Sequence, residues 1–218
     1  MKDIPKIIWQ THEVSYNDLD NVYKKNISIW LTKNIEWQHR YFNAEERKNF
    51  LINNGFLKSD LALKHYDNLH PINQADLWRV AVVWLNGGAW VDIDSRPSED
   101  NTLNKAIEKA GETKIDYTII CTYDPNHLHI GCNNAHFIGV KGSNFLKYLL
   151  DKWTSALHAD WKAIEYSKKF QRLEFVLNSG EFGRSTIYRD DVAYTFPPVL
   201  HGDEYKPKNE KRIPEKGW

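Results

Sequence analysis

Cysteine is nearly absent from this chain, which has only Cys121 and Cys132 among its 218 residues. Two cysteines form no disulfide framework, and their spacing lacks the paired pattern of a structural zinc site. The natural default for such a chain is a reducing, cytoplasmic setting. Because a chain of this length can bury a substantial core without cross-links, we expect one domain over residues 1–218.

An excess of charge of either sign is also missing. Lys and Arg total 29 and Asp and Glu total 29, so the formal net charge is zero. This balance argues against a nucleic-acid partner, since proteins that bind nucleic acid usually carry a basic excess or patch. No apolar run reaches the length of a membrane span, and residues 1–5 lack the apolar region of a signal peptide. We expect no transmembrane segment, with peripheral membrane contact left open.

Strand-like and helical patterns alternate along the chain. Strands are expected over residues 6–10, 37–42, 89–92, 116–122, 136–140 and 192–196, and helices over 17–33, 44–53, 59–69, 71–86, 103–110, 144–153 and 161–177. We expect Asn17 or Asp18 to cap the first helix and Gly111 to stop the fifth. This alternation predicts an α/β fold with a mostly parallel central sheet flanked by helices. The ends of the strands near residues 11 and 92 should then meet at one edge of the sheet.

Two aspartates, Asp92 and Asp94, follow the apolar residues 89–91. If the strand continues through them, residues two apart face the same way and can hold one divalent cation. Hard cations such as Mg²⁺ take carboxylate oxygens and often bridge to substrate phosphates. The alternative is a solvated turn, because a bare D-x-D is a weak signal.

The helix expected before this strand is apolar nearly all round, which indicates a buried helix. Asp76 and Arg79 lie three residues apart on it and so share a face. Buried charges need partners. The two side chains either pair with each other or line a polar ligand pocket beside the D-x-D.

Three segments together resemble the D-x-D sugar-binding region of glycosyltransferase family 32. They are residues 4–11 (IPKIIWQT), 75–79 (ADLWR) and 87–94 (GGAWVDID). The family includes capsular and mannosyl transferases, and the arrangement is also similar to the clostridial glucosylating toxins. The resemblance covers residues 4–97 and implies a GT-A fold, a nucleotide-sugar donor, Mn²⁺ or Mg²⁺, and transfer with retention of anomeric configuration.

By position, the resemblance implies roles for individual residues. Trp9 would lie at the nucleotide base, with Gln10 and Thr11 beside it, although Trp9 could instead be a core aromatic. Asp76 and Arg79 would contact the donor sugar and phosphate. Asp92 would contact the ribose, or the metal through water, and Asp94 would bind the metal directly. The catalytic residues expected on this basis are Asp76, Arg79 and Asp94.

The second half of the chain matches more loosely. Residues 201–207 (HGDEYKP) are similar to a late element of family 8 enzymes, which would make His201 a third metal ligand and Lys206 a phosphate contact. A solvated loop is the alternative. Asn133 and Asn134 would lie near donor sugar and acceptor. Zinc binding by His129, Cys132 and His136 is less favoured than ordinary packing.

The leading hypothesis is therefore a metal-dependent retaining glycosyltransferase. It would move a hexose from a UDP- or GDP-linked donor to a hydroxyl acceptor on a growing glycan, as in polysaccharide biosynthesis. One alternative is a metal-dependent nucleotide-sugar hydrolase or phosphoesterase, which an acceptor would not stimulate. Another is a non-catalytic nucleotide-sugar-binding module, which would bind without turnover.

Overall fold

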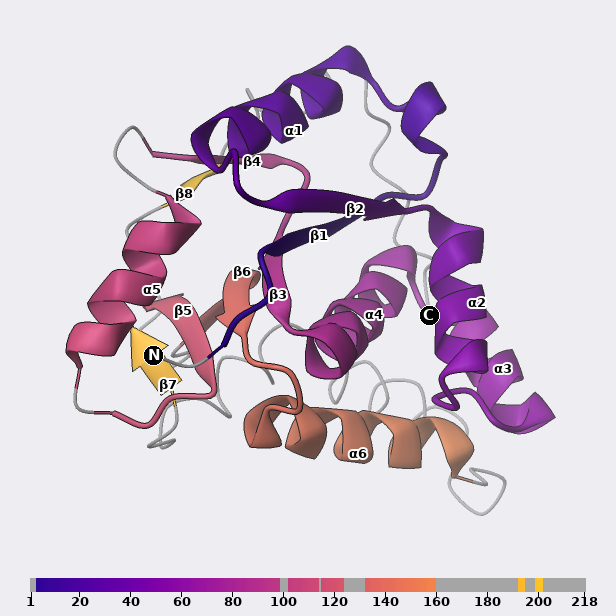
Figure 1. Cartoon of the computed structure of the whole chain (residues 1–218). Coiled ribbons are helices and arrows are strands. Elements are labelled where there is room, and N and C mark those ends of the chain that lie inside the picture. Colours follow the sequence, from indigo (N-terminus) through magenta and orange to yellow (C-terminus); the bar gives the residue numbers. More distant parts are fainter. Residues whose placement is uncertain are drawn as a thin grey trace.

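The computed structural model describes residues 3–98, 102–113, 115–123, 132–159, 192–194 and 199–201. Helices and strands follow one another in the order drawn in Figure 1. They are β1 (Ile7–Thr11), the 3₁₀ turn η1 (Tyr16–Asp18), α1 (Asn21–Lys33), β2 (Gln38–Phe42), α2 (Ala44–Asn53), α3 (Asp60–Asp67), α4 (Pro71–Asn86), β3 (Gly88–Val91), β4 (Ser95–Pro97), α5 (Leu103–Glu112), β5 (Ile119–Tyr123), β6 (Cys132–Gly139), α6 (Asn144–His158), β7 (Val192–Tyr194) and β8 (Val199–His201).

Six strands form the central sheet, in the order β2-β1-β3-β6-β5-β7. Three of its five pairings are parallel, namely β1 with β2, β1 with β3, and β5 with β7. Strand β6 runs antiparallel to both of its neighbours. Strands β4 and β8 form a separate two-stranded sheet. The expected α/β architecture with a mostly parallel sheet is confirmed.

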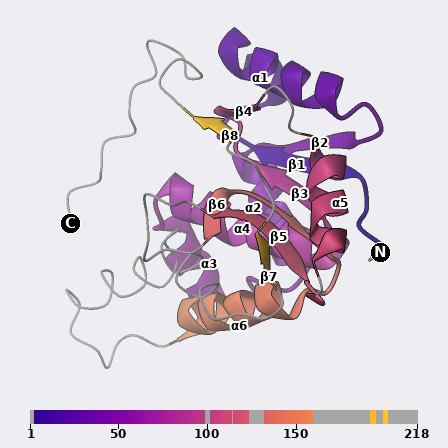
Figure 2. The same cartoon turned by 90° about the vertical axis from the view of Figure 1, so that its left-hand side faces the viewer.

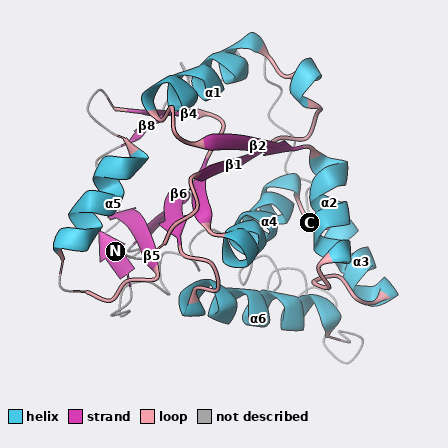
Figure 3. Ribbon diagram, viewed as in Figure 1, coloured by secondary structure: helices cyan, strands magenta, loops and turns pink. Residues whose placement is uncertain are grey.

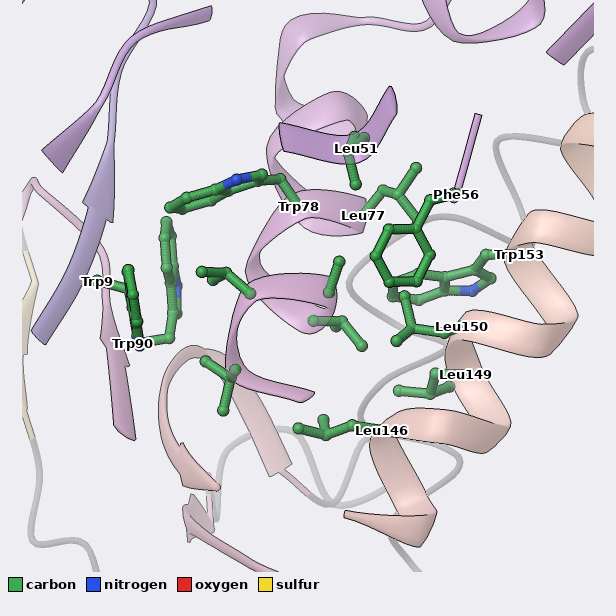
Figure 4. Packing of buried hydrophobic residues seen from close by; sticks show 14 of the residues in the cluster. Trp9, Leu51, Phe56, Leu77, Trp78, Trp90, Leu146, Leu149, Leu150 and Trp153 are labelled. Atoms are coloured by element: carbon green, nitrogen blue, oxygen red, sulfur yellow. The ribbon is translucent and has the colours of Figure 1, made fainter. Parts of the chain in front are cut away.

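Helices cover both faces of the sheet, as Figures 2 and 3 show. Alternate residues of β1 point to opposite faces, and this divides the core. Trp9 belongs to a cluster with residues of α2, α3, α4 and α6, part of which Figure 4 shows. Ile8 belongs to a second cluster with Trp30 of α1 and the apolar face of α5. The sheet is therefore buried on both faces, as the apolar strands predict.

Two expected helix ends are wrong. Asn17 and Asp18 lie in η1, and α1 begins only at Asn21. The cap is Asp20, whose carboxylate accepts the Val22 backbone N–H and so satisfies one of the first unpaired donors of the helix. Helix α5 does not stop at Gly111 but continues to Glu112. A single glycine weakens a helix without ending it.

The cysteine expectation also needs correction, because Cys121 is disulfide-bonded and no free cysteine lies among the described residues. The low cysteine content therefore no longer supports a reducing setting. Within the described part of the chain, no helix is long and apolar enough to cross a membrane. The helix expected over residues 161–177, His129 and Lys206 lie outside the described residues.

Candidate functional site

The carboxyl ends of β1 and β3 lie side by side at one edge of the sheet. The two strands are parallel, with Ile8 opposite Ala89 and Trp9 opposite Trp90. Strand β1 ends at Thr11, two residues after Trp9, and strand β3 ends at Val91, one residue after Trp90. The expected meeting of these two strand ends is confirmed.

The D-x-D residues lie in a turn and not in a strand. Strand β3 ends at Val91, and Asp92, Ile93 and Asp94 connect it to β4. The turn closes because the backbone N–H and hydroxyl of Ser95 both donate to the Asp92 carbonyl, at 3.2 and 2.6 Å. Burial still alternates, since Ile93 is buried while both aspartates are half-buried. The expectation of a continuous strand is wrong. Both aspartates are nevertheless partly exposed, and the Ile93 between them is buried.

Helix α4 brings a buried ion pair to the same place. Asp76 and Arg79 are 2% and 6% exposed, and Arg79 Nη2 lies 2.9 Å from Asp76 Oδ1. The same carboxylate oxygen accepts from the side-chain amide of Asn134 on β6, at 3.2 Å. The pairing alternative for Asp76 and Arg79 is confirmed, and the partners satisfy charges that would otherwise be costly to bury.

Arg79 links this pair to the D-x-D turn. Its Nη1 donates to the Asn134 carbonyl at 2.9 Å and lies 3.4 Å from Asp92 Oδ1. Its guanidinium also stacks 4.8 Å from the centre of the Trp90 ring, whose Nε1 donates to the same Asp92 oxygen at 2.9 Å. One cation therefore holds α4, β6 and the first aspartate in a fixed arrangement.

Carboxylates gather at this site, and they influence one another's charge. Burial raises the pKa of Asp76 to about 6; the Arg79 cation opposes this rise and the Asp92 carboxylate adds to it. Asp76 and Asp92 thus share one guanidinium, and Asp94 lies two residues further along the turn. Carboxylates gathered in this way favour a cation as ligand.

The donor atoms suit a hard divalent cation, which takes carboxylate oxygens and completes its shell with water or phosphate. Within the described residues no three His, Cys, Asp or Glu side chains form a metal-binding group. Strand β8 brings a further candidate near, because the backbone of His201 pairs opposite Ser95, next to Asp94 in sequence. The D-x-D carboxylates fit a metal shared with a phosphate ligand better than a closed protein cage.

Residues at the end of β1 have mainly structural contacts. Trp9 is 6% exposed and donates its Nε1 hydrogen to the Gly87 carbonyl at 2.9 Å. Gln10 bonds to the His39 ring at 3.0 Å, and Thr11 donates to the Phe42 carbonyl at 2.6 Å. These contacts favour the core alternative for Trp9, because stacking on a base requires an exposed ring face.

The sequence reasoning missed the aromatic residues just after β1. Tyr16 is 43% exposed and meets Tyr41 edge-on, with ring centroids 5.6 Å apart. The His12 ring lies 5.0 Å from that of Tyr23. The signal was the position of His12 and Tyr16 in a loop past a buried strand, where binding residues commonly lie.

The region that contains this site is similar to known glycosyltransferases. The family model described as a glycosyltransferase sugar-binding region containing a DXD motif matches residues 20–111, which include Asp76, Arg79 and both aspartates of the turn. Residues 20–111 of this chain are therefore similar to the sugar-binding region of DXD glycosyltransferases. The match runs from Asp20, the cap of α1, to Gly111 in α5, so it covers the acidic turn and the helices on either side.

A curated relative of this chain is the initiation-specific alpha-1,6-mannosyltransferase of Schizosaccharomyces pombe. It is 30% identical over 97 residues, which are 44% of this chain and 24% of that enzyme. The chain thus spans about a quarter of its relative's length. Among solved structures, PaToxG glycosyltransferase aligns with a TM-score of 0.55 and 15% identity, over 84% of this chain and 68% of its own. That likeness shows the fold, which is the GT-A fold.

Proposed function

We propose that this chain is a metal-dependent glycosyltransferase that moves a hexose from a UDP- or GDP-linked donor to a hydroxyl of a glycan acceptor. One observation carries the proposal. The Asp92–Asp94 turn stands at the edge where β1 and β3 end, tied through Arg79 to Asp76 on α4. Open α/β sheets bind their ligands outside the carboxyl ends of the strands. We further propose that residues 1–218 form one GT-A domain.

Each residue of the site has a proposed role. Asp94 is proposed as the direct metal ligand from its position in the D-x-D. One oxygen of Asp92 receives a hydrogen bond from Trp90 and contacts Arg79. Asp92 binds the metal through water or contacts the ribose. His201 supplies a third ligand, for which the β4–β8 register is the support. When bound, Mn²⁺ or Mg²⁺ neutralises charge on the departing diphosphate.

Asp76 and Arg79 act by holding the acidic turn in place and presenting its charge. The Arg79 side chain is nearly enclosed and bonds protein groups through both terminal nitrogens. Such a cation favours negative charge nearby without having to reorganise when the donor arrives. Lys206 remains the proposed phosphate contact, and the donor sugar lies nearest Asp76 and Asn134.

The nucleoside is proposed to lie over the loop that follows β1. Tyr16 offers an exposed ring there, whereas Trp9 is enclosed in the core. Aromatic faces stack on nucleobases without strong preference for sequence. Replacing Tyr16 by Ala should therefore raise the KM for the donor and leave the metal requirement unchanged.

A donor screen tests the proposal. UDP-Glc, UDP-Gal, UDP-GlcNAc, UDP-GalNAc and GDP-Man are each incubated with Mn²⁺ or with EDTA, and the released nucleoside diphosphate is measured. Release from one donor that EDTA abolishes supports the proposal and names the sugar. Stimulation by a glycan acceptor separates transfer from hydrolysis. Proton NMR of the anomeric centre in the product tests retention of configuration.

Two results would contradict the proposal. Release that no acceptor stimulates would favour the nucleotide-sugar hydrolase. Absence of release from every donor, with no thermal shift from UDP or GDP plus Mn²⁺, would exclude a nucleotide-sugar site of this kind.

A further inference from the structure

Helix α1 contacts the acidic turn from the face opposite α4. The side chain of Ile93 packs into a small buried cluster with Leu19, Tyr23 and Ile27. Two polar side chains of the same helix reach the backbone on either side of Asp94. Asn26 Nδ2 donates to the Ile93 carbonyl at 3.0 Å, and Trp30 Nε1 donates to the Ser95 carbonyl at 3.0 Å.

Asn26 is the polar centre of this contact. It is fully buried, at 0% exposure, and its Oδ1 accepts from Arg96 Nε at 2.6 Å. One amide therefore binds the middle residue of the D-x-D and the second residue of β4. The Ile93 carbonyl needs a donor and the Arg96 Nε–H needs an acceptor. Among side chains of this size only an amide provides both.

We propose that Asn26 is a positioning residue for the metal site, setting the angle of the turn so that the two carboxylates can share one cation. This inference rests on the proposed function, because it concerns the same acidic pair. Asn26 acts on the turn through its hydrogen bonds to the Ile93 carbonyl and the Arg96 side chain. Mutation of partners that orient metal ligands typically lowers metal affinity by about 10–100-fold.

Asn26→Asp is the informative substitution. It preserves the size of the side chain and the acceptor for Arg96, but replaces the donor to Ile93 by an oxygen that repels the carbonyl. Asn34→Asp is the matched control. Asn34 ends the same helix, is 4% exposed, accepts from the Leu103 N–H at 2.8 Å and donates to the Trp30 carbonyl at 2.9 Å. Both changes remove one buried donor, and only the first touches the turn.

Hydrogen exchange without metal gives the first readout. Residues 92–96 should exchange at least about tenfold faster in Asn26→Asp than in the wild type, and at the wild-type rate in Asn34→Asp, since a lost buried hydrogen bond eases local opening. The second readout is calorimetric titration of Mn²⁺ in the presence of UDP or GDP. The Mn²⁺ dissociation constant should rise about 10–100-fold in Asn26→Asp and stay within about twofold in Asn34→Asp.

The outcomes separate the two proposals. Unchanged exchange over residues 92–96, or faster exchange with unchanged Mn²⁺ affinity, would overturn the role of Asn26 while leaving the glycosyltransferase proposal intact. Equal loss of Mn²⁺ affinity in both variants would show a general effect of destabilisation and would also overturn it. A wild type that binds no Mn²⁺ with either nucleotide would overturn the proposed function, and the positioning role with it.

Discussion

At the scale of single residues, Arg79 is a cation with two carboxylate partners and little contact with solvent. Replacing it by methionine keeps the apolar stem but leaves Asp76, at 2% exposure, without its cation. We expect Arg79→Met to lower the free energy of unfolding by about 3–5 kcal/mol, the usual cost of breaking a buried pair from one side. Urea denaturation followed by tryptophan fluorescence measures this loss.

A double variant provides the control. Asp76→Leu combined with Arg79→Met removes the unpaired buried charge and should recover a large part of the lost stability. A single Arg79→Met variant that loses less than about 1 kcal/mol would show that the buried pair matters little to the fold.

Asp94 is the residue through which the proposed metal requirement can be tested most directly. Asp94→Asn keeps the size of the side chain but removes the charge that binds a hard cation. We expect donor turnover to fall by at least about a thousandfold, while the circular dichroism spectrum and melting temperature change little. Asp151→Asn, on an α6 carboxylate that is 61% exposed, is the control and should retain full activity. Full activity of Asp94→Asn would refute its metal role.

At the scale of elements, two glycines make a matched pair. Gly88 begins β3 with φ at +103°, and a Cβ there would lie 2.6 Å from the Ile7 carbonyl oxygen. Gly111 lies inside α5, and a Cβ there would meet no atom within 4 Å. We expect Gly88→Ala to destabilise the fold by about 2 kcal/mol or more, and Gly111→Ala to stabilise it by about 0.5–1 kcal/mol.

Thermal unfolding of the two alanine variants distinguishes backbone conformation from glycine content. Equal effects at both positions would show that the close approach of β1 to the start of β3 does not restrict Gly88. A more stable Gly111→Ala variant would confirm that residue 111 has an ordinary helical conformation, in which alanine is preferred to glycine.

The sequence predicted elements better than their ends, for identifiable reasons. The apolar run within residues 71–86 predicted α4 correctly as a buried helix, because its buried residues surround the helix. Periodicity could not show that Asp20 would cap α1, since Asn17, Asp18 and Asp20 are all suitable caps. Nor could it show that β3 ends before Asp92, because that end depends on hydrogen bonds from Ser95 to the Asp92 carbonyl.

At the scale of the whole molecule, burial of His39 links stability to pH. Burial disfavours the imidazolium and lowers the pKa of His39 to about 4. Its neutral form therefore stabilises the fold above the ordinary histidine pKa of about 6.5, and this contribution is lost as the pH falls from 6.5 towards 4. We expect a loss of up to about 3 kcal/mol over that interval.

Asp76 acts in the opposite direction in an overlapping interval. Its raised pKa, about 6, means that the folded state takes up a proton more readily than the unfolded chain as the pH falls. The test is therefore the difference between wild type and His39→Gln, measured by urea unfolding at pH 7 and pH 4.5. His39→Gln should lose less stability on acidification, and parallel curves would contradict the prediction.

The site was predictable from the sequence in its charged residues and not in its aromatic ones. Asp76, Arg79, Asp92 and Asp94 stand out because charges beside apolar runs need partners, and the structure places the first three in one network. For Trp9, strand alternation alone does not tell which face of the sheet meets α4, where its ring belongs to the core cluster. Asn26 gave no signal, since the Ile93 carbonyl and the Arg96 guanidinium that it bonds are 67 and 70 residues away in the chain.

The junction between α4 and β3 consists of a single residue, Gly87, whose N–H still bonds the helix at Val83, at 2.7 Å. This connection cannot take up an extra residue without moving the helix or the strand. An inserted residue would slip the pairing of Trp90 with Trp9 by one position and turn every side chain of β3 to the other face. Among natural relatives and in engineered libraries, insertions and deletions should therefore be absent between Asp76 and Asp94. Length variation should accumulate instead in exposed connections such as residues 35–36, between α1 and β2.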